Sequence, residues 1–434
     1  MHSYVSTRGR SHASLSEALE RGLAPDGGLY VPTGDVPFPI PPDTARSSFA
    51  HTARWAAEVL LPDVESEILS QVIDDALNFD VPLVEVEPHL HVLELFHGPT
   101  HAFKDVGARF MARLMARVLP RNRTRTVLVA TSGDTGGAVA AAFHRVPGYR
   151  VAVLFPSRGI SERQRRQMTT LGDNVLALAV EGTFDDCQRL AKAAFLDRAL
   201  SERFALTSAN SINIGRLLPQ AFYYVRAALL LGWDAAAPRF VVPCGNLGNL
   251  CAGLLAHRRG MPSSGFLAAT NVNDAFVDFL DTGDHRPRAS IATASNAMDV
   301  GDPSNLERIQ WLYRNDPEQM RRDVRANSVT DETTARTIAT VYRESGYVLD
   351  PHSAVAYDVA KRHRPPPSAD EPSVVLATAH PAKFPEIVEP ALGHEIPLPQ
   401  GLAHAMEGEE RALSLEPELG ALSDVLVEHG AEAS

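Results

Sequence analysis

Cysteine is scarce in this 434-residue sequence, and its few positions show no organised spacing. Cys187, Cys244 and Cys251 are odd in number and form no C-x-x-C pair, so neither a disulfide framework nor a thiolate metal site is indicated. The chain also lacks any run of about 18 consecutive apolar residues, and its start contains no apolar h-region. We therefore expect a soluble protein of the reducing cytoplasm, without a membrane partner.

Clustered metal ligands and an excess of basic charge are also missing. The 16 histidines include no H-E-x-x-H pattern, and His97, His101, His352 and His380 are better explained as structural or hydrogen-bonding residues than as zinc ligands. The formal net charge is -12, and the short basic runs at 121–125 and 161–167 carry no interleaved aromatic residues for base stacking. We expect neither a metal ion nor a nucleic acid as a partner, and we interpret the basic runs as solvated surfaces.

Short apolar strands alternate with helical stretches over most of the chain beyond residue 90. Strands are expected at 92–96, 126–131, 149–156, 174–180, 239–243, 266–272 and 373–379. Strands without period-two alternation, each followed by a helix, are typical of a parallel sheet covered on both faces. Because a single core rarely grows past roughly 250–300 residues, we predict an α/β protein with two open parallel-type sheet domains.

The pattern also suggests how the chain is divided. Residues 1–90 are expected to form a mainly helical region packing on the larger domain, 91–205 the smaller α/β domain, and 206–434 the larger α/β domain with a C-terminal extension. Residues 364–372 are expected to be a surface loop, and the acidic segment after Leu402 a peripheral tail. Ligands of open α/β folds bind outside the carboxyl ends of the strands, so we expect the site in a cleft between the sheets.

One glycine-containing loop lies between the expected strand at 239–243 and a helix that starts directly after it. In the motif G-N-L-G-N (245–249), Gly245 and Gly248 permit close backbone approach, and the free N–H groups of a helix start favour a phosphate dianion. The motif lacks the Lys and Ser/Thr of a Walker loop and the third glycine of a dinucleotide-binding loop. Taken alone, the motif is better explained as a tight strand-to-helix turn.

A second glycine-rich loop, T-S-G-D-T-G-G (131–137), follows the strand at 126–131. Ser132, Thr135 and the backbone N–H groups near Gly136 could hold a second small anion, such as a substrate carboxylate. The alternative is that Ser132 and Asp134 only cap the following helix. Two anion sites on neighbouring sheets would suit a ligand pair.

Lys104 follows the Gly-Pro turn of the motif F-H-G-P-T-H-A-F-K-D and opens an apolar helical stripe. Burial can depress the pKa of a lysine by up to about 3–5 units, which far exceeds the effect of the helix dipole. A neutral amine beside an apolar cleft is a nucleophile that can form a Schiff base. The alternative is a solvated lysine in the first turn of a helix.

Considered together, a lysine and an anion-binding loop at strand ends match a cofactor that carries both an aldehyde and a phosphate. Pyridoxal 5′-phosphate (PLP) has these two groups, and its ring nitrogen needs a partner. The last expected strand ends in A-T-A-H-P-A-K-F, which offers the hydroxyl of Thr378. The sequence therefore predicts a PLP site.

Motifs along nearly the whole chain resemble those of the threonine synthase family, fold type II PLP enzymes with a tryptophan synthase β-like fold, in its longer bacterial and fungal branch. They are, in chain order, Y-V-S-T-R-G, G-L-A-P-D-G-G-L-Y-V-P, E-L-F-H-G-P-T-H-A-F-K-D, T-S-G-D-T-G-G-A, N-S-I-N-I-G-R, G-N-L-G-N, S-N-A-M-D-V-G-D-P-S-N, L-D-P-H-S-A-V-A and A-T-A-H-P-A-K-F. So many motifs in family order are a specific signal.

The resemblance implies roles for particular residues. Lys104 is similar to the family lysine that holds PLP covalently and transfers protons, and Thr378 to the partner of the pyridine nitrogen. The residues that match the cofactor-phosphate loop are Gly245, Asn246, Leu247, Gly248 and Asn249.

The family converts O-phospho-L-homoserine and water into L-threonine and phosphate, so the resemblance implies a lyase of threonine biosynthesis. Candidate substrate-binding residues are Ser132, Asp134 and Thr135, with Asn213, Arg216 and Lys383 for the leaving phosphate, because arginine binds phosphate bidentately. The alternative for the last three is a packing or helix-surface role.

Some positions depart from the family pattern, and other functions stay open. Leu247 replaces an aromatic residue, Ile214 and Gly215 replace a common Trp-Ala pair, and His101 stands where leucine is usual. Alternative functions are another fold type II lyase, such as threonine dehydratase or cysteine synthase, and a non-catalytic protein that retains the fold. Retention of Lys104 and the glycine loop argues against the latter.

Overall fold

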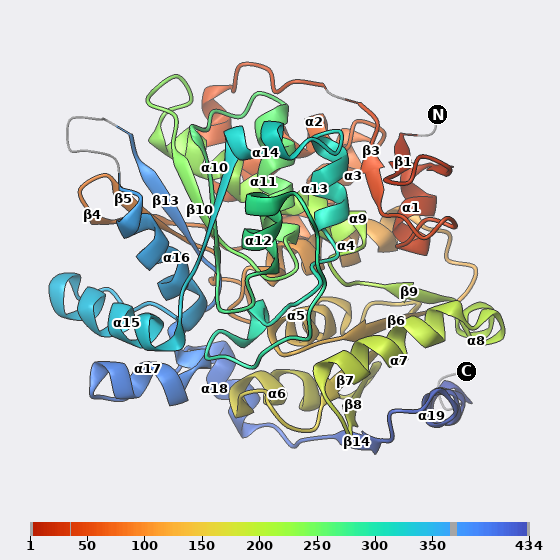
Figure 1. Cartoon of the computed structure of the whole chain (residues 1–434). Coiled ribbons are helices and arrows are strands. Elements are labelled where there is room, and N and C mark those ends of the chain that lie inside the picture. Colours follow the sequence, from red (N-terminus) through yellow and green to blue (C-terminus); the bar gives the residue numbers. More distant parts are fainter. Residues whose placement is uncertain (1–2, 35, 365–370, 432–434) are drawn as a thin grey trace.

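The computed structural model describes residues 3–34, 36–364 and 371–431 of the chain. Figure 1 shows a large sheet on the left, a smaller sheet at the lower right, and the C-terminal segment running beneath the smaller sheet. No helix within the described ranges is both long and apolar enough to cross a membrane. The expected surface loop at 364–372 lies mostly outside the described residues.

The larger sheet has six strands in the order β12-β11-β10-β13-β5-β4. All neighbouring pairs are parallel except β4 and β5, which pair antiparallel. The strands are β4 (Leu83–Glu87), β5 (Leu90–Glu94), β10 (Arg239–Pro243), β11 (Gly265–Thr270), β12 (Val324–Ser328) and β13 (Ser373–Ala377). Successive side chains point to opposite faces: Val241 packs with α16 (Pro351–Arg362), and Val242 with α10 (Ala221–Leu231) and α11 (Gly248–Arg258). This two-sided burial explains why the strands are continuously apolar.

The smaller sheet has five parallel strands in the order β14-β8-β7-β6-β9. They are β6 (Arg125–Ala130), β7 (Tyr149–Pro156), β8 (Val175–Val180), β9 (Leu206–Ser208) and β14 (Ala412–Leu415). Helix α5 (Asp134–Phe143) packs on one face and α7 (Phe184–Leu196) on the other. The predicted pair of parallel-type sheets is therefore present.

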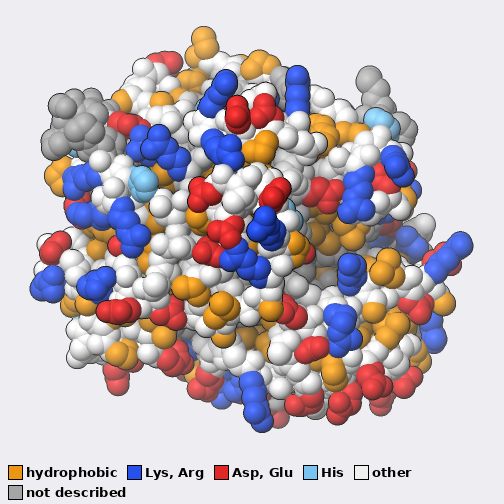
Figure 2. All heavy atoms as spheres, in the orientation of Figure 1, with side chains coloured by type: hydrophobic (Ala, Val, Ile, Leu, Met, Phe, Trp, Pro, Cys, Tyr) orange, Lys and Arg blue, Asp and Glu red, His pale blue; other side chains and the backbone are white. Residues whose placement is uncertain are grey.

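The sheet pairings depart from the expected chain segments at two points. Strand β5, within the expected smaller domain, pairs with β13 of the larger sheet. The acidic segment after Leu402 was expected to be a peripheral tail, but β14 extends the smaller sheet and α19 (Leu419–Ala431) buries Leu422 and Leu426 against it. Acidic side chains line the lower edge of the molecule in Figure 2, where Figure 1 shows this segment.

The N-terminal region contains the expected helices together with a small sheet. Helices α1 (Leu15–Arg21), α2 (Phe49–Leu60) and α3 (Ser66–Ala76) accompany three short antiparallel strands, β1 (Tyr4–Ser6), β2 (His12–Ala13) and β3 (Tyr30–Pro32). Ser14 caps α1 with a capping box, in which Glu17 bonds back to the Ser14 backbone. Helix α2 packs against α10 and α3 against α4 (Lys104–Val118), so this region is joined to the rest of the protein by helix–helix packing.

Candidate active site

Lys104 is the first residue of helix α4, and the turn before it is built around a buried carboxylate. The Thr100 backbone N–H and hydroxyl donate to Asp105 at 2.9 and 2.7 Å. A Cβ added to Gly98 would lie 2.5 Å from Asp105 Oδ2, so only glycine fits there. The Phe103 N–H donates to the backbone oxygen of Thr378 at 2.8 Å. The Gly-Pro turn therefore holds Lys104 beside the carboxyl end of β13.

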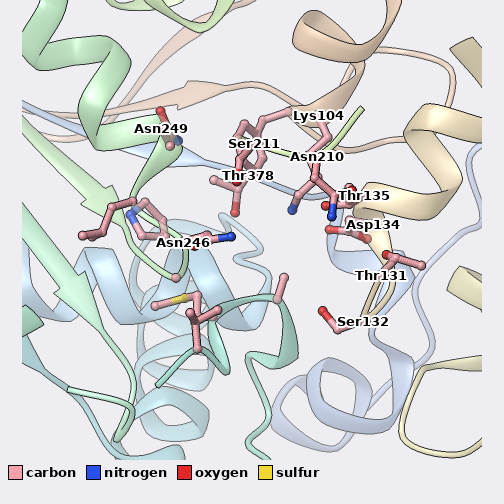
Figure 3. Close-up of a pocket in the computed structure, with 18 of the residues that line it drawn as sticks. Lys104, Thr131, Ser132, Asp134, Thr135, Asn210, Ser211, Asn246, Asn249 and Thr378 are labelled. Carbon is pink, nitrogen blue, oxygen red and sulfur yellow. The ribbon is translucent and has the colours of Figure 1, made fainter. Parts of the chain in front are cut away.

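The amine of Lys104 faces a pocket between the two sheets. It has no hydrogen-bond partner among the described residues, and its Nζ lies 4.6 Å from the centre of the Phe103 ring. Burial lowers the pKa of Lys104 to about 8, with Arg216 and Lys383 adding to the effect and Asp134 opposing it. Figure 3 shows Lys104, Thr378 and Asn246 around the same cavity. The neutral, nucleophilic form of this amine is therefore far more populated near neutral pH than that of an ordinary lysine.

The glycine loop (residues 245–249) connects β10 to α11 in the expected way. Leu247 has a φ of 58°, a left-handed conformation that is uncommon for a residue other than glycine. A Cβ on Gly245 would lie 2.8 Å from the Ala297 backbone oxygen, and one on Gly248 would lie 3.2 Å from the Ser211 Cβ. A side chain at Gly245 would therefore clash with the backbone, whereas one at Gly248 would be tightly packed; the loop lines the pocket at the start of α11.

Two asparagines of the glycine loop are held firmly in place. The Asn246 side-chain oxygen accepts from Ser304 N at 2.6 Å, and its backbone oxygen accepts from Asn305 Nδ2 at 2.9 Å. Asn249 Oδ1 accepts from the hydroxyls of Tyr223 and Tyr224, whereas its buried Nδ2 has no partner. A buried donor without a partner beside the pocket is suited to a ligand acceptor.

The second loop leaves two hydroxyls directed toward the pocket. Thr131 Oγ1 accepts from the backbone N–H groups of Gly133 and Gly136 at 2.9 and 2.8 Å, which shapes the turn. Ser132 and Thr135 line the pocket and are only partly buried. The residue before helix α5 is Gly133, and the first-turn N–H of Gly136 is satisfied by Thr131, so the alternative that Ser132 and Asp134 only cap the helix does not describe this turn.

Asp134 and Lys383 form a buried ion pair across the two sheet domains. Their side chains are 3% and 0% exposed with a separation of 2.8 Å, and Lys383 also donates to the Thr100 backbone oxygen at 2.9 Å. Gln164 Nε2 donates to Asp134 at 2.9 Å. Burial alone would raise the pKa of Asp134, but the charges of Lys383 and Lys104 hold it well below its usual range. Asp134 lines the pocket and Lys383 does not.

Thr378 follows β13 and lines the pocket beside Lys104. Its backbone N–H donates to the Ser353 hydroxyl at 3.3 Å, and that hydroxyl donates to Asp350. Asp350 also accepts from His352 Nδ1 at 2.8 Å, while Ala297 N–H donates to His352 Nε2 at 3.2 Å. This network fixes the Thr378 backbone and the orientation of the His352 ring.

Arg216 and Asn213 belong to one motif but have different surroundings. Arg216 lines the pocket, its buried Nε has no partner, and burial lowers its pKa to about 10. Asn213 is 0% exposed and caps α9 (Ile214–Leu217) by accepting from Gly215 N. Its Nδ2 donates to the backbone oxygens of Leu19 and Ser208 at 2.9 Å. Asn213 therefore has no free donor for a ligand.

The pocket thus brings together most of the residues singled out from the sequence. Those that line it are Lys104, Ser132, Asp134, Thr135, Arg216, Gly245, Asn246, Leu247, Gly248, Asn249 and Thr378. Asn213 and Lys383 lie outside the lining. Asn210, Ser211 and Gln188 also line the pocket and were not among the expected site residues, and His352, which was expected to be structural or hydrogen-bonding, lines it as well. Asn210 and Ser211 could have been found, because they open the same motif that contains Arg216.

These residues fit PLP. The amine of Lys104 can bond to the aldehyde, the N–H groups of the glycine loop can donate to the phosphate, and the Thr378 hydroxyl can meet the ring nitrogen. The buried Asn249 Nδ2, which has no partner in the protein, offers a further donor at the wall of the pocket. Within the described ranges, no group of three His, Cys, Asp or Glu residues could hold a metal ion.

Comparisons with known proteins agree with this chemistry. Residues 81–379 match the family model "Pyridoxal-phosphate dependent enzyme". Residues 3–77 match "Threonine synthase N terminus", and residues 353–426 match "Threonine synthase, C-terminal". The chain is 40% identical to threonine synthase of Escherichia coli strain K12 over 420 residues, covering 96% of this chain and 97% of the relative. It is 41% identical to threonine synthase of Serratia marcescens over 395 residues, covering 90% of each.

Solved structures lead to the same family. The crystal structure of threonine synthase from Escherichia coli superposes with a TM-score of 0.91 at 38% identity, covering 98% of this chain and 99% of that one. The PLP-bound threonine synthase from Brucella melitensis gives 0.90 at 38% identity, covering 99% of both chains. A threonine deaminase from Solanum lycopersicum, at 17% identity and a TM-score of 0.58, shares the fold alone. The predicted α/β fold and PLP cofactor are confirmed, and the chain belongs to the threonine synthase family of PLP-dependent enzymes.

Proposed function

We propose that this protein converts O-phospho-L-homoserine and water into L-threonine and phosphate, in the cytoplasm. In this reaction the Cγ–O bond breaks, phosphate leaves with the bonding electrons, Cγ gains a proton to become a methyl group, and Cβ exchanges a hydrogen for the hydroxyl of water. When bound, PLP supplies an electron sink that stabilises negative charge at the substrate carbons. The protein must bind the carboxylate and the phosphate of the substrate, and it must move protons to and from the substrate carbons.

Lys104 is the group proposed to move protons. Its amine faces the pocket without a protein partner and has a pKa lowered to about 8, mainly by burial. An amine with this pKa can accept a proton from the substrate Cα and return it at neutral pH. Asp134, whose pKa is held well below its usual range by Lys383 and Lys104, supplies a permanent negative charge beside it. That charge stabilises the protonated state of Lys104.

The two anionic groups of the substrate are proposed to bind on different walls of the pocket. Ser132 and Thr135 offer hydroxyls for the carboxylate at the end of β6. Arg216 offers an unpartnered Nε for the phosphate, close to Ser211 and Asn210 in the same motif. A guanidinium can bind two phosphate oxygens at once, and this interaction is stronger in a site shielded from water than at the surface.

Asn213 and Lys383 are proposed to position other residues and not to touch the substrate. Asn213 fixes the start of the helix that carries Arg216 through its bonds to Leu19 and Ser208. Lys383 fixes Asp134 through their ion pair. Replacement of either residue should reduce activity through these neighbours.

The observation that carries the proposal is the meeting of three groups in one pocket: the amine of Lys104, the glycine loop and the guanidinium of Arg216, whose Nε has no partner. Threonine dehydratase chemistry needs the first two, but its substrate has no phosphate for Arg216 to bind. The third group therefore favours the phosphorylated substrate. A non-catalytic function would not require an amine with a pKa lowered to about 8.

The test is to supply the purified holoenzyme with O-phospho-L-homoserine and measure phosphate and threonine together. The two products should appear in equal amounts, and Arg216→Ala should lower kcat/KM by about 100-fold or more, as expected for a lost charged contact to phosphate. Arg226→Ala is the matched control, because Arg226 is also buried but does not line the pocket. Formation of a keto acid from threonine without phosphate release from phosphohomoserine would favour the dehydratase alternative. An unchanged Arg216→Ala enzyme would remove the proposed phosphate site.

A further inference from the structure

Arg308 is the largest side chain with less than 2% exposure among the described residues, and it has no assigned function. It belongs to α13 (Leu306–Leu312), immediately after the motif S-N-A-M-D-V-G-D-P-S-N. Its guanidinium donates to backbone oxygens of Tyr30, Ser211 and Ile212 at 3.0, 2.9 and 2.6 Å, and to Asn305 Oδ1 at 2.7 Å. These bonds join the N-terminal region to the wall of the pocket.

All four acceptors of Arg308 are neutral. No Asp or Glu oxygen of the described residues lies within 4.0 Å of its guanidinium. The adjacent Glu307 instead pairs with Arg8 at 3.2 Å near the surface. By contrast, the buried Lys383 is paired with Asp134. The buried Arg216, which lines the pocket, resembles Arg308 in having no acidic partner within 4.0 Å among the described residues. Burial lowers the pKa of Arg308 to about 10, so it stays charged at neutral pH. A buried charge without a counter-charge is unfavourable unless a ligand supplies one.

A single side chain, Asn305, connects Arg308 to the glycine loop. Asn305, which accepts from Arg308, uses its Nδ2 to donate to the Asn246 backbone oxygen at 2.9 Å and to the Ser211 hydroxyl at 3.2 Å. A Cβ on Gly248 would lie 3.4 Å from this Nδ2 and 3.2 Å from the Ser211 Cβ. The neighbours of Arg308 therefore form the underside of the loop, and its charge lies beneath the N-terminus of α11.

We propose that Arg308 is a positioning residue for the cofactor phosphate: it fixes Asn305 and Ser211 against the glycine loop, and its charge is balanced by the bound dianion. This inference rests on the assignment of PLP to the pocket. The loop N–H groups and the helix N-terminus would hold the phosphate, and Arg308 would supply a full charge behind them. The contribution of Arg308 should therefore depend on the phosphate group of the ligand and not on its ring or aldehyde.

The test compares the affinities of the apo-protein for PLP and for pyridoxal, which lacks the phosphate, by absorbance titration. Arg308→Met should weaken PLP binding by about ten-fold or more, since a partly shielded full charge is lost, and should leave pyridoxal binding unchanged. Arg308→Lys keeps the charge and should recover most of the preference for PLP. Arg226→Met is the control, because Arg226 is a buried arginine that donates to the Arg46 backbone oxygen away from the pocket. The ratio of its affinities for PLP and for pyridoxal should equal that of the unmodified protein.

Equal losses for PLP and pyridoxal, or no loss of PLP affinity, would overturn the proposal. If Arg308→Met does not fold, Asn305→Asp and Asn305→Ala decide the question. Both substitutions remove the amide donor, but only aspartate supplies Arg308 with a counter-charge from the protein. The Asn305→Asp variant should therefore lose more affinity for PLP, relative to pyridoxal, than the Asn305→Ala variant. Equal losses in the pair would also overturn the proposal. Failure of the unmodified protein to bind either ligand would instead contradict the proposed function.

Discussion

The pKa of Lys104 leads to a quantitative prediction about the reactivity of its amine. The ordinary value is 10.5, and burial lowers the pKa of Lys104 to about 8. At pH 7 an amine with a pKa of about 8 is neutral in roughly one molecule in ten, whereas an ordinary lysine is neutral in roughly one in 3000. The nucleophilic form of Lys104 should thus be enriched roughly 300-fold over that of a surface lysine.

The assay is the rate at which the apo-protein adds to pyridoxal, followed by absorbance between pH 6 and 11, with N-α-acetyl-lysine as the reference. Because a lysine loses its charge as the pH rises, the rate for Lys104 should rise through a midpoint near 8 and then level off. Lys104→Met should lose the fast reaction. A midpoint near 10.5, or a fast reaction that persists in Lys104→Met, would refute the reasoning.

A nearby substitution tests the cause of the shift. Arg216 is one of the cations that lower the pKa of Lys104, so Arg216→Gln should move the midpoint to higher pH. Arg226→Gln removes a buried arginine outside the pocket and should leave the midpoint where it is. A midpoint that stays near 8 in Arg216→Gln would mean that Arg216 does not contribute to the lowered pKa of Lys104.

Three further predictions concern stability and can be measured by chemical denaturation. Gly98→Ala should destabilise the protein by about 1–3 kcal/mol, because the added Cβ would lie 2.5 Å from Asp105 Oδ2. Lys383→Met should cost about 3–5 kcal/mol at neutral pH by leaving Asp134 buried without its partner. Because the pKa of Asp134 is lowered in the folded protein, this difference should shrink as the pH falls below about 4. Leu422→Ala should cost about 2–5 kcal/mol, since Leu422 is 0% exposed.

Each of these predictions has a matched control. Gly34→Ala adds a methyl group where no atom lies within 4 Å, and it should change stability by less than about 0.5 kcal/mol. Asp134→Asn combined with Lys383→Met should recover much of the loss seen in the single Lys383 variant, because no unpaired charge remains. Leu413→Ala, at a position 39% exposed, should cost far less than Leu422→Ala. Equal effects in a variant and its control would contradict the corresponding explanation.

The strands and the chemistry of the pocket could be predicted where the signal is local. The continuous apolar runs at 149–156 and 239–243 coincide with β7 and β10, because parallel strands buried on both faces need no alternation. Lys104, the glycine loop and Thr378 meet because each follows a strand of the larger sheet, and the carboxyl ends of parallel strands lie on one edge. Residue type and strand order therefore suffice for this part of the site.

Long-range partners could not be predicted from local patterns. Strand β14 is only four residues long, and its pairing with β8 joins segments more than 200 residues apart. The strands of the N-terminal sheet have two or three residues each, too few to show a period. Asn213 is bonded to Leu19, which a motif alone cannot reveal. Sequence reasoning therefore found the right motif but not which of its side chains faces the pocket.

The central claim is that Lys104 bonds to the aldehyde of PLP, and borohydride reduction followed by peptide mapping tests it most directly. The chain has only four lysines, Lys104, Lys192, Lys361 and Lys383, so the position of the label is unambiguous. Lys383 is paired with Asp134 and Lys361 with Glu87, while Lys192 lies outside the lining of this pocket. The account predicts a pyridoxyl label on Lys104 alone. A label on any of the other three lysines, or none after reduction of the holoenzyme, would contradict it.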